Sequence, residues 1–249
     1  MIIQPTKGLF TRSQIAELTG ASESSLNFWM REGVLRSSEG DGGKGNHRKF
    51  RFYEVHIAAL FVRLHRFGCN IEAFRQLSTI FHEAVDYIEG IDVCYAFTED
   101  EWDILGSILT DRRRFNRDGY VERMVREGLE EYPGLERHKV GPYVEYVRLT
   151  WDQVVENWRN SRAGGRLTDK VLEACKKIEP KEFIDKSSIF SLITSIPRAR
   201  HGDELDYFVR DKSGVWTVVA DPAEASKISD AYIAVAMHSI KYGIWNTNE

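Results

Sequence analysis

The hydrophobic pattern near the N-terminus predicts two short helices separated by a tight turn. In the first helix, Ile15 and Leu18 share one face. Thr11 precedes this helix as an N-cap, and Gln14 stands in the capping-box position three residues later. Gly20 then interrupts the pattern. The second helix carries its apolar residues at helical spacing, and these are Leu26, Trp29 and Met30. Two short helices joined by a glycine-containing turn are typical of a helix-turn-helix.

The segment after the second helix predicts a basic β-hairpin. Ser22 is the expected N-cap of that helix, and Gly33 is the expected residue that ends it in a left-handed conformation. Val34 and Leu35 follow as a short apolar strand, and residues 48–53 alternate basic and aromatic side chains beyond a glycine-rich stretch. Alternation with a period of two around a glycine turn predicts a hairpin. A hairpin directly after a helix-turn-helix is a wing, whose cationic side chains can lie along phosphates while the aromatic ones pack inward.

The rest of the chain predicts a mixed but mainly helical body. Helices are expected at residues 55–67, 71–91, 98–115, 120–132, 150–158, 168–178 and near 188–196, extended segments at 93–97 and 143–149, a hairpin at 205–220 around the turn 211–214, and a final helix from Asp221 with an apolar stripe reaching Ile240. The expected fold class is therefore mainly α with small β. We expect a winged helix-turn-helix head at residues 1–77, and at residues 78–249 a body of unknown type for a partner, an effector or dimerisation.

Composition places the chain among ordinary globular proteins, with 42% hydrophobic and 29% charged residues in 249. This length corresponds to one or two domains and allows a core without disulfides or structural metals. Cys69, Cys94 and Cys175 are far apart and odd in number, which favours a reducing cytoplasm over a disulfide framework. Because there is no apolar run of membrane-spanning length and no secretion signal at the N-terminus, we expect a cytoplasmic protein.

The charge of the chain is distributed unevenly. The first 75 residues hold eleven of the 34 Lys and Arg but only seven of the 38 Asp and Glu, and the remainder is net negative. A basic head on an acidic body suggests that only the head meets a polyanion, although a difference of this size also arises by chance.

Several fragments in the head occur in an order and spacing that together are specific. They are Phe10-Thr11, Ile15-Ala16-Glu17-Leu18-Thr19-Gly20, Ala21-Ser22-Glu23-Ser24-Ser25-Leu26-Asn27-Phe28-Trp29, Gly33-Val34-Leu35, Arg48 with Phe50, Val55, and Phe67-Gly68-Cys69-Asn70-Ile71-Glu72. In these fragments, residues 9–77 resemble the MerR-type transcription regulators. That family usually carries Arg where this chain has Asn27, and Tyr where it has Phe28. Since both family residues touch the DNA backbone, the resemblance implies that one cationic and one hydroxyl contact are missing here.

The resemblance implies a set of DNA-binding residues on the second helix and the wing. The helix would turn Ser24, Ser25, Asn27, Phe28 and Arg31 toward the major groove, the wing would supply Lys44, His47, Arg48, Lys49 and Arg51, and Thr11 completes the set. Asn27 could read adenine edges, and Arg31 could contact guanine or phosphate. Two plainer alternatives stay open. Arg31 could pair with Glu32 or Glu54, and Asn27 could be an ordinary surface amide.

No catalytic, metal or cofactor motif stands out in the sequence. Residues 43–45 read Gly-Lys-Gly, without the Ser or Thr that a phosphate-binding loop needs after its lysine. His201 beside Asp203 and Glu204 is better explained as a polar turn before a strand than as a metal or base cluster. The many Tyr and Trp residues of the body would suit an aromatic cage for a cationic ligand, but aromatic residues at such spacing more often form a core. We therefore expect no enzyme activity, no metal and no cofactor.

The function expected from the sequence is sequence-specific binding of double-stranded DNA by a cytoplasmic transcription regulator. A homodimer is expected on a two-fold related site, because one small module gives limited specificity. The resemblance also implies RNA polymerase as a partner, through distortion of promoter DNA; a small-molecule effector stays unknown. The alternatives are a DNA-bending architectural or excisionase-like recombination factor, and an unrecognised enzyme delivered to DNA.

Overall fold

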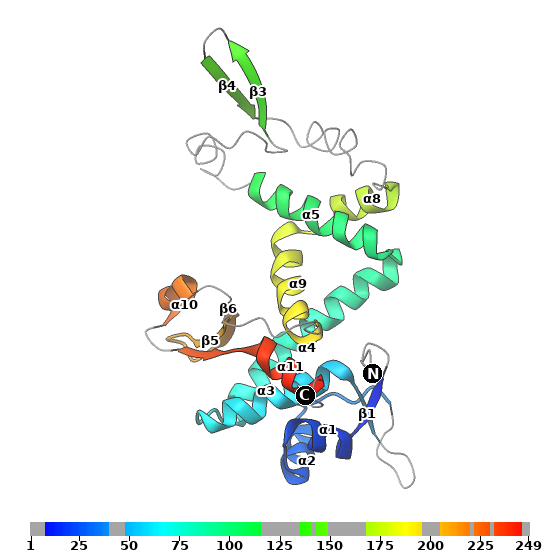
Figure 1. Ribbon diagram of the computed structural model, residues 1–249, viewed down its shortest axis with the longest axis vertical. Helices are drawn as coiled ribbons and strands as arrows, with labels where there is room; N and C mark the ends of the chain where they lie inside the picture. The colour runs from blue at the N-terminus through cyan, green and yellow to red at the C-terminus, as the bar shows by residue number, and fades with distance from the viewer. Residues whose placement is uncertain are drawn as a thin grey trace. The chain divides into compact units, whose positions relative to one another are not determined.

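A computed structural model of the chain describes residues 8–39, 48–115, 135–140, 143–148, 168–195, 205–219, 222–229 and 232–245 (Figure 1). These residues form mainly helices, with three small antiparallel sheets among them, as the expected fold class requires. The chain divides into two compact units: residues 1–86 with 188–249, and residues 87–187. The first unit is discontinuous because the last part of the chain returns to pack with the N-terminal part.

The first unit opens with the predicted pair of short helices. Strand β1 (Leu9–Thr11) leads into α1 (Arg12–Thr19), and α2 (Glu23–Arg31) follows after a short turn. The capping box is confirmed, since the Thr11 hydroxyl accepts from the Gln14 backbone N–H at 3.4 Å and the Gln14 carboxamide accepts from the Thr11 N–H at 2.8 Å. The Ser22 hydroxyl likewise accepts from the Ser25 N–H at 3.1 Å and begins α2. Gly33, at φ 72°, adopts the expected left-handed conformation just after α2.

The strand predicted at residues 34–35 is wrong. Val34 is buried in a bend, where its N–H donates to the Trp29 carbonyl at 2.8 Å. Strand β2 (Lys49–Arg51) pairs instead with β1, Phe10 standing opposite Phe50, and on its other side Glu39 bridges to Lys49. The sequence pattern predicted the alternation of side chains in β2 but not the strand that pairs with it. The tip of the expected wing, including Lys44 and His47, lies outside the described residues.

Helix α3 (Phe52–Arg66) begins three residues earlier than predicted, and α4 (Ile71–Tyr95) extends beyond its predicted end. The extended segment predicted at residues 93–97 is wrong, since α4 continues through Gly90 to Tyr95. A helical glycine costs only about 1 kcal/mol, and the buried Ile88 and Ile91 hold the helix on its apolar face. Asn70 caps α4 as expected, its side-chain oxygen accepting from the Ala73 N–H at 3.1 Å.

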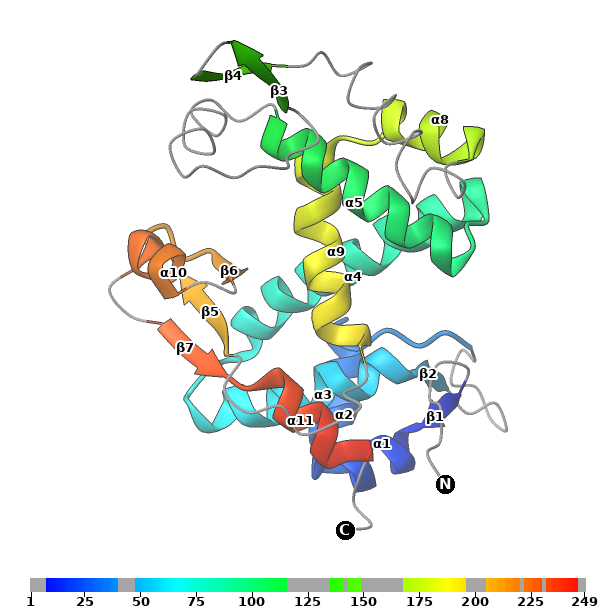
Figure 2. The same ribbon diagram turned by 45° about the horizontal axis from the view of Figure 1, so that its top comes forward.

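The C-terminal part of the first unit contains a three-stranded sheet and the helices α10 and α11. Strands β5 (Asp206–Arg210) and β6 (Trp216–Val219) form the predicted hairpin around residues 211–214. The single final helix predicted from Asp221 is wrong. Helix α10 (Pro222–Ile228) ends early, β7 (Tyr232–Val235) joins the sheet in the order β6-β5-β7, and α11 (Met237–Trp245) follows (Figure 2). Tyr232 and Val235 fit a helical stripe on paper, but the free edge of β5 offers them backbone pairing instead.

The first unit has one hydrophobic core that both parts of the chain build. Trp29 of α2 meets Phe61 of α3 and Phe74 of α4 edge to face, and the two phenylalanine rings stack at 4.6 Å. The C-terminal part adds five residues to the same buried cluster: Ile193, Phe208, Val235, Met237 and Ile244. The packing of α2, which positions the candidate interface, thus depends on α3 and α4 directly and on residues 188–249 through the shared core.

The second unit contains the end of α4, α5 (Glu99–Phe115), β3 (Leu135–Val140), β4 (Tyr143–Arg148), α8 (Asp169–Lys177) and the start of α9 (Pro180–Thr194). Strand β4 confirms the prediction near residues 143–149, whereas α9 begins well before the predicted 188. The helices predicted at 120–132 and 150–158 lie outside the described residues. Glu101 joins α5 to α8 by accepting from the Thr168 hydroxyl at 2.9 Å and pairing with Lys170 at 2.7 Å. The contact with Lys170, the hydrogen bond from the Thr98 N–H and the one from Thr168 together lower the pKa of Glu101 to about 2.

Candidate nucleic-acid interface

Helix α2 has one buried and one open face. Leu26 and Trp29, which are 1% and 5% exposed, fasten the buried face to the core. Four of the predicted site residues lie on the exposed positions of the helix, and these are Ser24, Asn27, Phe28 and Arg31. Ser25 is only partly exposed. This division follows from the helical spacing of the apolar residues, which leaves the intervening positions to solvent.

Two of the exposed α2 side chains form a cation–π pair. The Arg31 guanidinium lies over the Phe28 ring at 5.2 Å from its centre and pairs with Glu32 at 3.5 Å. Glu32 is held more firmly by Arg75 of α4, and the hydrogen bond from Arg75 is the main cause of the lowered pKa of Glu32. Arg31 stays 73% exposed in its side chain, so a pair of this kind leaves it open to a phosphate. Of the two partners considered for Arg31, the structure places Glu32 beside it.

Asn27 has a neighbour that the sequence did not reveal. Arg12, the first residue of α1, donates from Nη1 to the Asn27 side-chain oxygen at 2.5 Å. Its other terminal nitrogen pairs with Glu23 in the first turn of α2 at 3.3 Å. Since Arg12 and Asn27 are fifteen residues apart, no local pattern links them. Only the expected position of Arg12 at the start of the first helix hinted that it would face the second.

The hydroxyl groups among the predicted site residues make hydrogen bonds to residues nearby in the sequence. Thr11 is occupied by the capping box with Gln14. The Ser24 and Ser25 hydroxyls both lie within hydrogen-bond distance of the Ser22 hydroxyl, at 2.9 and 2.8 Å. A hydroxyl can donate and accept at the same time, so these contacts leave capacity for a further partner.

Strand β2 confirms the alternation of basic and aromatic positions. Phe50 is 1% exposed and packs inward, while Lys49 and Arg51 on either side are exposed, as is Arg48 before them. Lys49 makes a long ion pair of 3.6 Å with Glu39. Arg48 lines a cavity of about 480 Å³. Its other walls include Met30 of α2, Leu35 just after that helix, and Ser78 and His82 of α4.

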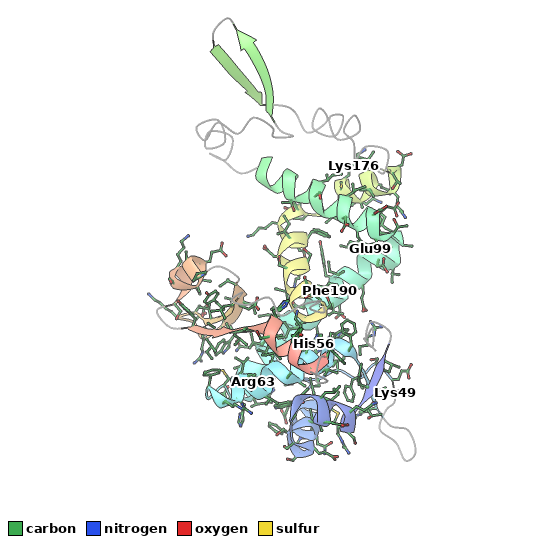
Figure 3. All side chains as sticks on the ribbon, viewed as in Figure 1. Lys49, His56, Arg63, Glu99, Lys176 and Phe190 are labelled. Atoms are coloured by element: carbon green, nitrogen blue, oxygen red, sulfur yellow. The ribbon has the colours of Figure 1, made fainter. Side chains whose placement is uncertain are left out.

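Further exposed cations lie at the C-terminal end of α3, where the sequence analysis proposed no site. Arg63 and Arg66 are both exposed there. In Figure 3, Lys49 and Arg63 lie on opposite sides of the α1–α2 pair. Positive side chains thus flank the two helices, a distribution that suits a polyanion extending across both sides.

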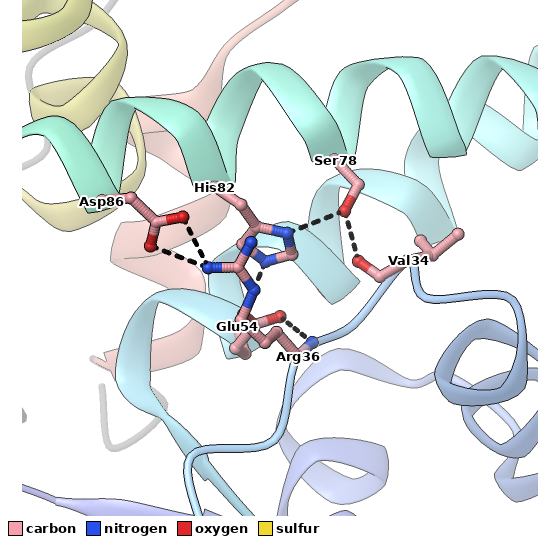
Figure 4. Close-up of polar contacts among 6 residues, drawn as sticks. All are labelled: Val34, Arg36, Glu54, Ser78, His82 and Asp86. Carbon is pink, nitrogen blue, oxygen red and sulfur yellow. Dashed lines mark hydrogen bonds and ion pairs between the residues drawn. The ribbon is translucent and has the colours of Figure 1, made fainter.

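A buried polar network fixes the chain just after α2 (Figure 4). Ser78 of α4 donates to the Val34 carbonyl at 2.7 Å and lies 3.2 Å from His82 Nδ1. His82 Nε2 is 2.7 Å from the Glu54 carboxyl group, which also accepts from the Arg36 N–H at 3.2 Å. Because the Ser78 proton is directed at the Val34 carbonyl, the Ser78 oxygen is left to accept from His82 Nδ1.

The same network continues to the protein surface. Arg36 extends to Asp86 of α4 with two contacts, at 2.7 and 2.9 Å, and the hydrogen bond to Asp86 is the main cause of the raised pKa of Arg36. Glu54 is fully buried. Buried polar groups that satisfy one another in this way define a single geometry for the segments they join. The turn between α2 and β2 is therefore anchored to both α3 and α4.

The N-terminal sequence matches a known family model. Residues 10–79 match the model of the MerR HTH family regulatory protein. This match identifies the MerR-type head, whose extent includes α1, α2, β2, α3 and the first part of α4. A helix-turn-helix of this family supports a role in DNA-binding regulation for the head. No curated protein and no solved structure is matched by the chain.

Two kinds of site are absent from the residues that the structure describes. Within them, no group of three or more His, Cys, Asp or Glu side chains could hold a metal ion. None of the helices in this part of the chain has both the length and the apolar character needed to cross a bilayer. His201, Asp203 and Glu204, for which the sequence predicts a polar turn before a strand, lie outside the described residues.

Proposed function

We propose that this chain is a sequence-specific transcription regulator that binds double-stranded DNA through helix α2 and the segment containing β2. The observation that carries the proposal is the exposed face of α2, held rigidly by the buried Leu26 and Trp29 and flanked by the cations of β2. A helix fastened on one side and open on the other can enter a major groove without rearrangement. The match of this segment to a DNA-binding regulatory family supports the same reading.

The proposed contacts divide into two kinds. Asn27 and Arg31 on α2 face base edges, with Ser24, Ser25 and Phe28 beside them. Arg48, Lys49 and Arg51, together with Lys44 and His47 from the wing, contact phosphates and supply affinity that depends on salt. Thr11, at the start of α1, contacts the backbone of the duplex.

We further propose that the regulator acts as a homodimer on a two-fold related site. One head offers a single short recognition helix, and two copies would double the number of base pairs read. RNA polymerase is the proposed partner at the promoter. The second unit, residues 87–187, would then be available for an effector or a partner protein.

The proposal is tested by selecting bound fragments from genomic DNA with the full chain, then measuring affinity for a selected duplex against salt concentration. We expect the logarithm of the binding constant to fall linearly with the logarithm of salt, by about 0.9 for each phosphate contact. Arg48→Ala should reduce the slope by about that amount. Lys177→Ala is the matched control, because Lys177 is an exposed cation of α8 in the other unit. Binding without a salt slope, together with an Arg48→Ala variant that binds like the wild type, would refute the proposal.

A further inference from the structure

The Arg12 guanidinium contacts two residues of α2 through its terminal nitrogens, while its third nitrogen is buried without a partner in the described part of the chain. Nη1 donates to the Asn27 side-chain oxygen at 2.5 Å, and Nη2 pairs with the Glu23 carboxylate at 3.3 Å. The third nitrogen, Nε, is buried and has no hydrogen-bond partner within the described part of the chain. The inner edge of the guanidinium is thus enclosed, while its outer end remains at the protein surface.

The outer end of Arg12 retains hydrogen-bonding capacity. Each terminal nitrogen of a guanidinium carries two N–H groups. Each uses one of them, so two N–H groups remain on a side chain that is 42% exposed. Nη1 lies beside the side-chain oxygen of Asn27, which is at an exposed position of α2. Arg12 also offsets the charge of Glu23, which would otherwise repel a phosphate approaching this end of the helix.

The contact also fixes which way the Asn27 amide faces. A guanidinium has only donors, so the Asn27 atom that faces it must be the oxygen, and the amide nitrogen points away. Bidentate recognition of adenine needs both the oxygen as an acceptor and the nitrogen as a donor. With its oxygen engaged by a charged donor, Asn27 presents chiefly N–H groups. These groups suit acceptors such as phosphate oxygens or the O6 and N7 atoms of guanine.

We infer that Arg12 is a specificity-determining residue of the DNA interface, which contacts the duplex with its two free N–H groups and holds Asn27 as a donor. The inference rests on the proposed function, since it assigns a further residue to the same surface. It changes the expected readout of Asn27 from adenine to an acceptor group.

The test compares Arg12→Ala, Arg12→Lys and Asn27→Ala in the full chain, with a duplex selected by the wild-type protein. Arg12→Ala should weaken binding about tenfold, as for loss of a charged hydrogen bond, and reduce the salt slope by about 0.9. Arg12→Lys keeps the charge, so its slope should stay near that of the wild type. Because an ammonium lacks the planar fork, repeated selection from randomised duplexes should show both Arg12 variants with an altered base preference at one position.

The double variant Arg12→Ala/Asn27→Ala shows whether the two residues act together. If Arg12 holds Asn27, removing Asn27 should cost clearly less in the Arg12→Ala background than in the wild type. Lys177→Ala is again the control, since it removes an exposed cation that is also paired with a glutamate. Thermal unfolding of each variant identifies any loss of fold, and Arg12→Lys carries the test if Arg12→Ala does not fold.

The possible failures are distinguishable. A wild-type protein that binds no DNA overturns the proposed function itself. A wild-type protein that binds with a salt slope, while both folded Arg12 variants keep its affinity, slope and base preference, overturns only the role of Arg12. Strictly additive effects of the Arg12 and Asn27 substitutions would leave Arg12 as an independent contact and overturn its control of Asn27.

Discussion

Acidification should lower the free energy of unfolding of the first unit through His56, a fully buried residue of α3. Nδ1 of His56 lies 2.6 Å from the Ile193 carbonyl, which can only accept, so Nδ1 carries the proton. Nε2 accepts from the indole N–H of Trp245 at 2.7 Å. A second proton on Nε2 would face another donor and break this bond. Burial lowers the pKa of His56 to about 4, and the nearby Lys241 acts in the same direction.

The direction of the pH effect follows from these pKa values. The ordinary pKa is 6.5 and the folded value is about 4, so between these pH values the unfolded chain binds more protons. The free energy of unfolding therefore falls as the pH drops through this interval, by about 1.4 kcal/mol per pH unit. From pH 7 to pH 4 the loss from His56 amounts to about 3 kcal/mol, a substantial part of the stability of a typical domain.

Urea unfolding at a series of pH values measures this dependence. His56→Gln should be less stable than the wild type at pH 7 but should lose less stability toward pH 4, because it has no proton to gain. His65→Gln, at an exposed position of the same helix, is the matched control and should keep the wild-type dependence. If the wild type and His56→Gln lost stability in parallel between pH 7 and pH 4, the reasoning about His56 would be refuted.

Three further substitutions test the packing and the caps. Phe61→Ala removes a fully buried ring that stacks on Phe74, and should lower the unfolding free energy by about 3–5 kcal/mol in urea titrations; a loss under 1 kcal/mol would contradict the packing described. Ser22→Ala removes the cap that receives the Ser25 N–H, and should cost about 1 kcal/mol by the same assay, whereas an unchanged midpoint would count against the cap. Glu101→Gln should destabilise the protein at neutral pH but not near pH 2, since the low pKa of Glu101 stabilises the fold only while the carboxylate is charged; equal losses at both pH values would show that charge is not the cause.

Local chemistry explains why much of the head could be predicted. The capping box of Thr11 and Gln14, the left-handed Gly33 and the alternation around Phe50 depend on residues within a few positions of one another. Their energies act within a single turn or strand, so the sequence pattern alone defines them. The exposed face of α2 follows equally from the spacing of Leu26 and Trp29.

Contacts between distant residues explain what could not be predicted. The partner of β2 is a three-residue strand at the N-terminus, too short to leave a pattern. Asn27 meets Arg12 through the turn between two helices, and His56 meets Ile193 across 137 positions. A stripe near Tyr232 satisfied helical periodicity, yet backbone pairing to β5 decided its conformation. Tertiary pairing of this kind overrides a local pattern.

The return of residues 188–249 to the N-terminal part makes the first unit discontinuous in sequence. A recombinant fragment that stops at residue 79, where the family match ends, would lack Phe208, Met237 and Ile244 from its interior. The apolar side chains of α3 that those residues cover would then face water, and such a surface promotes aggregation. A soluble minimal fragment should therefore be assembled from both ends of the chain, with a short linker replacing residues 87–187.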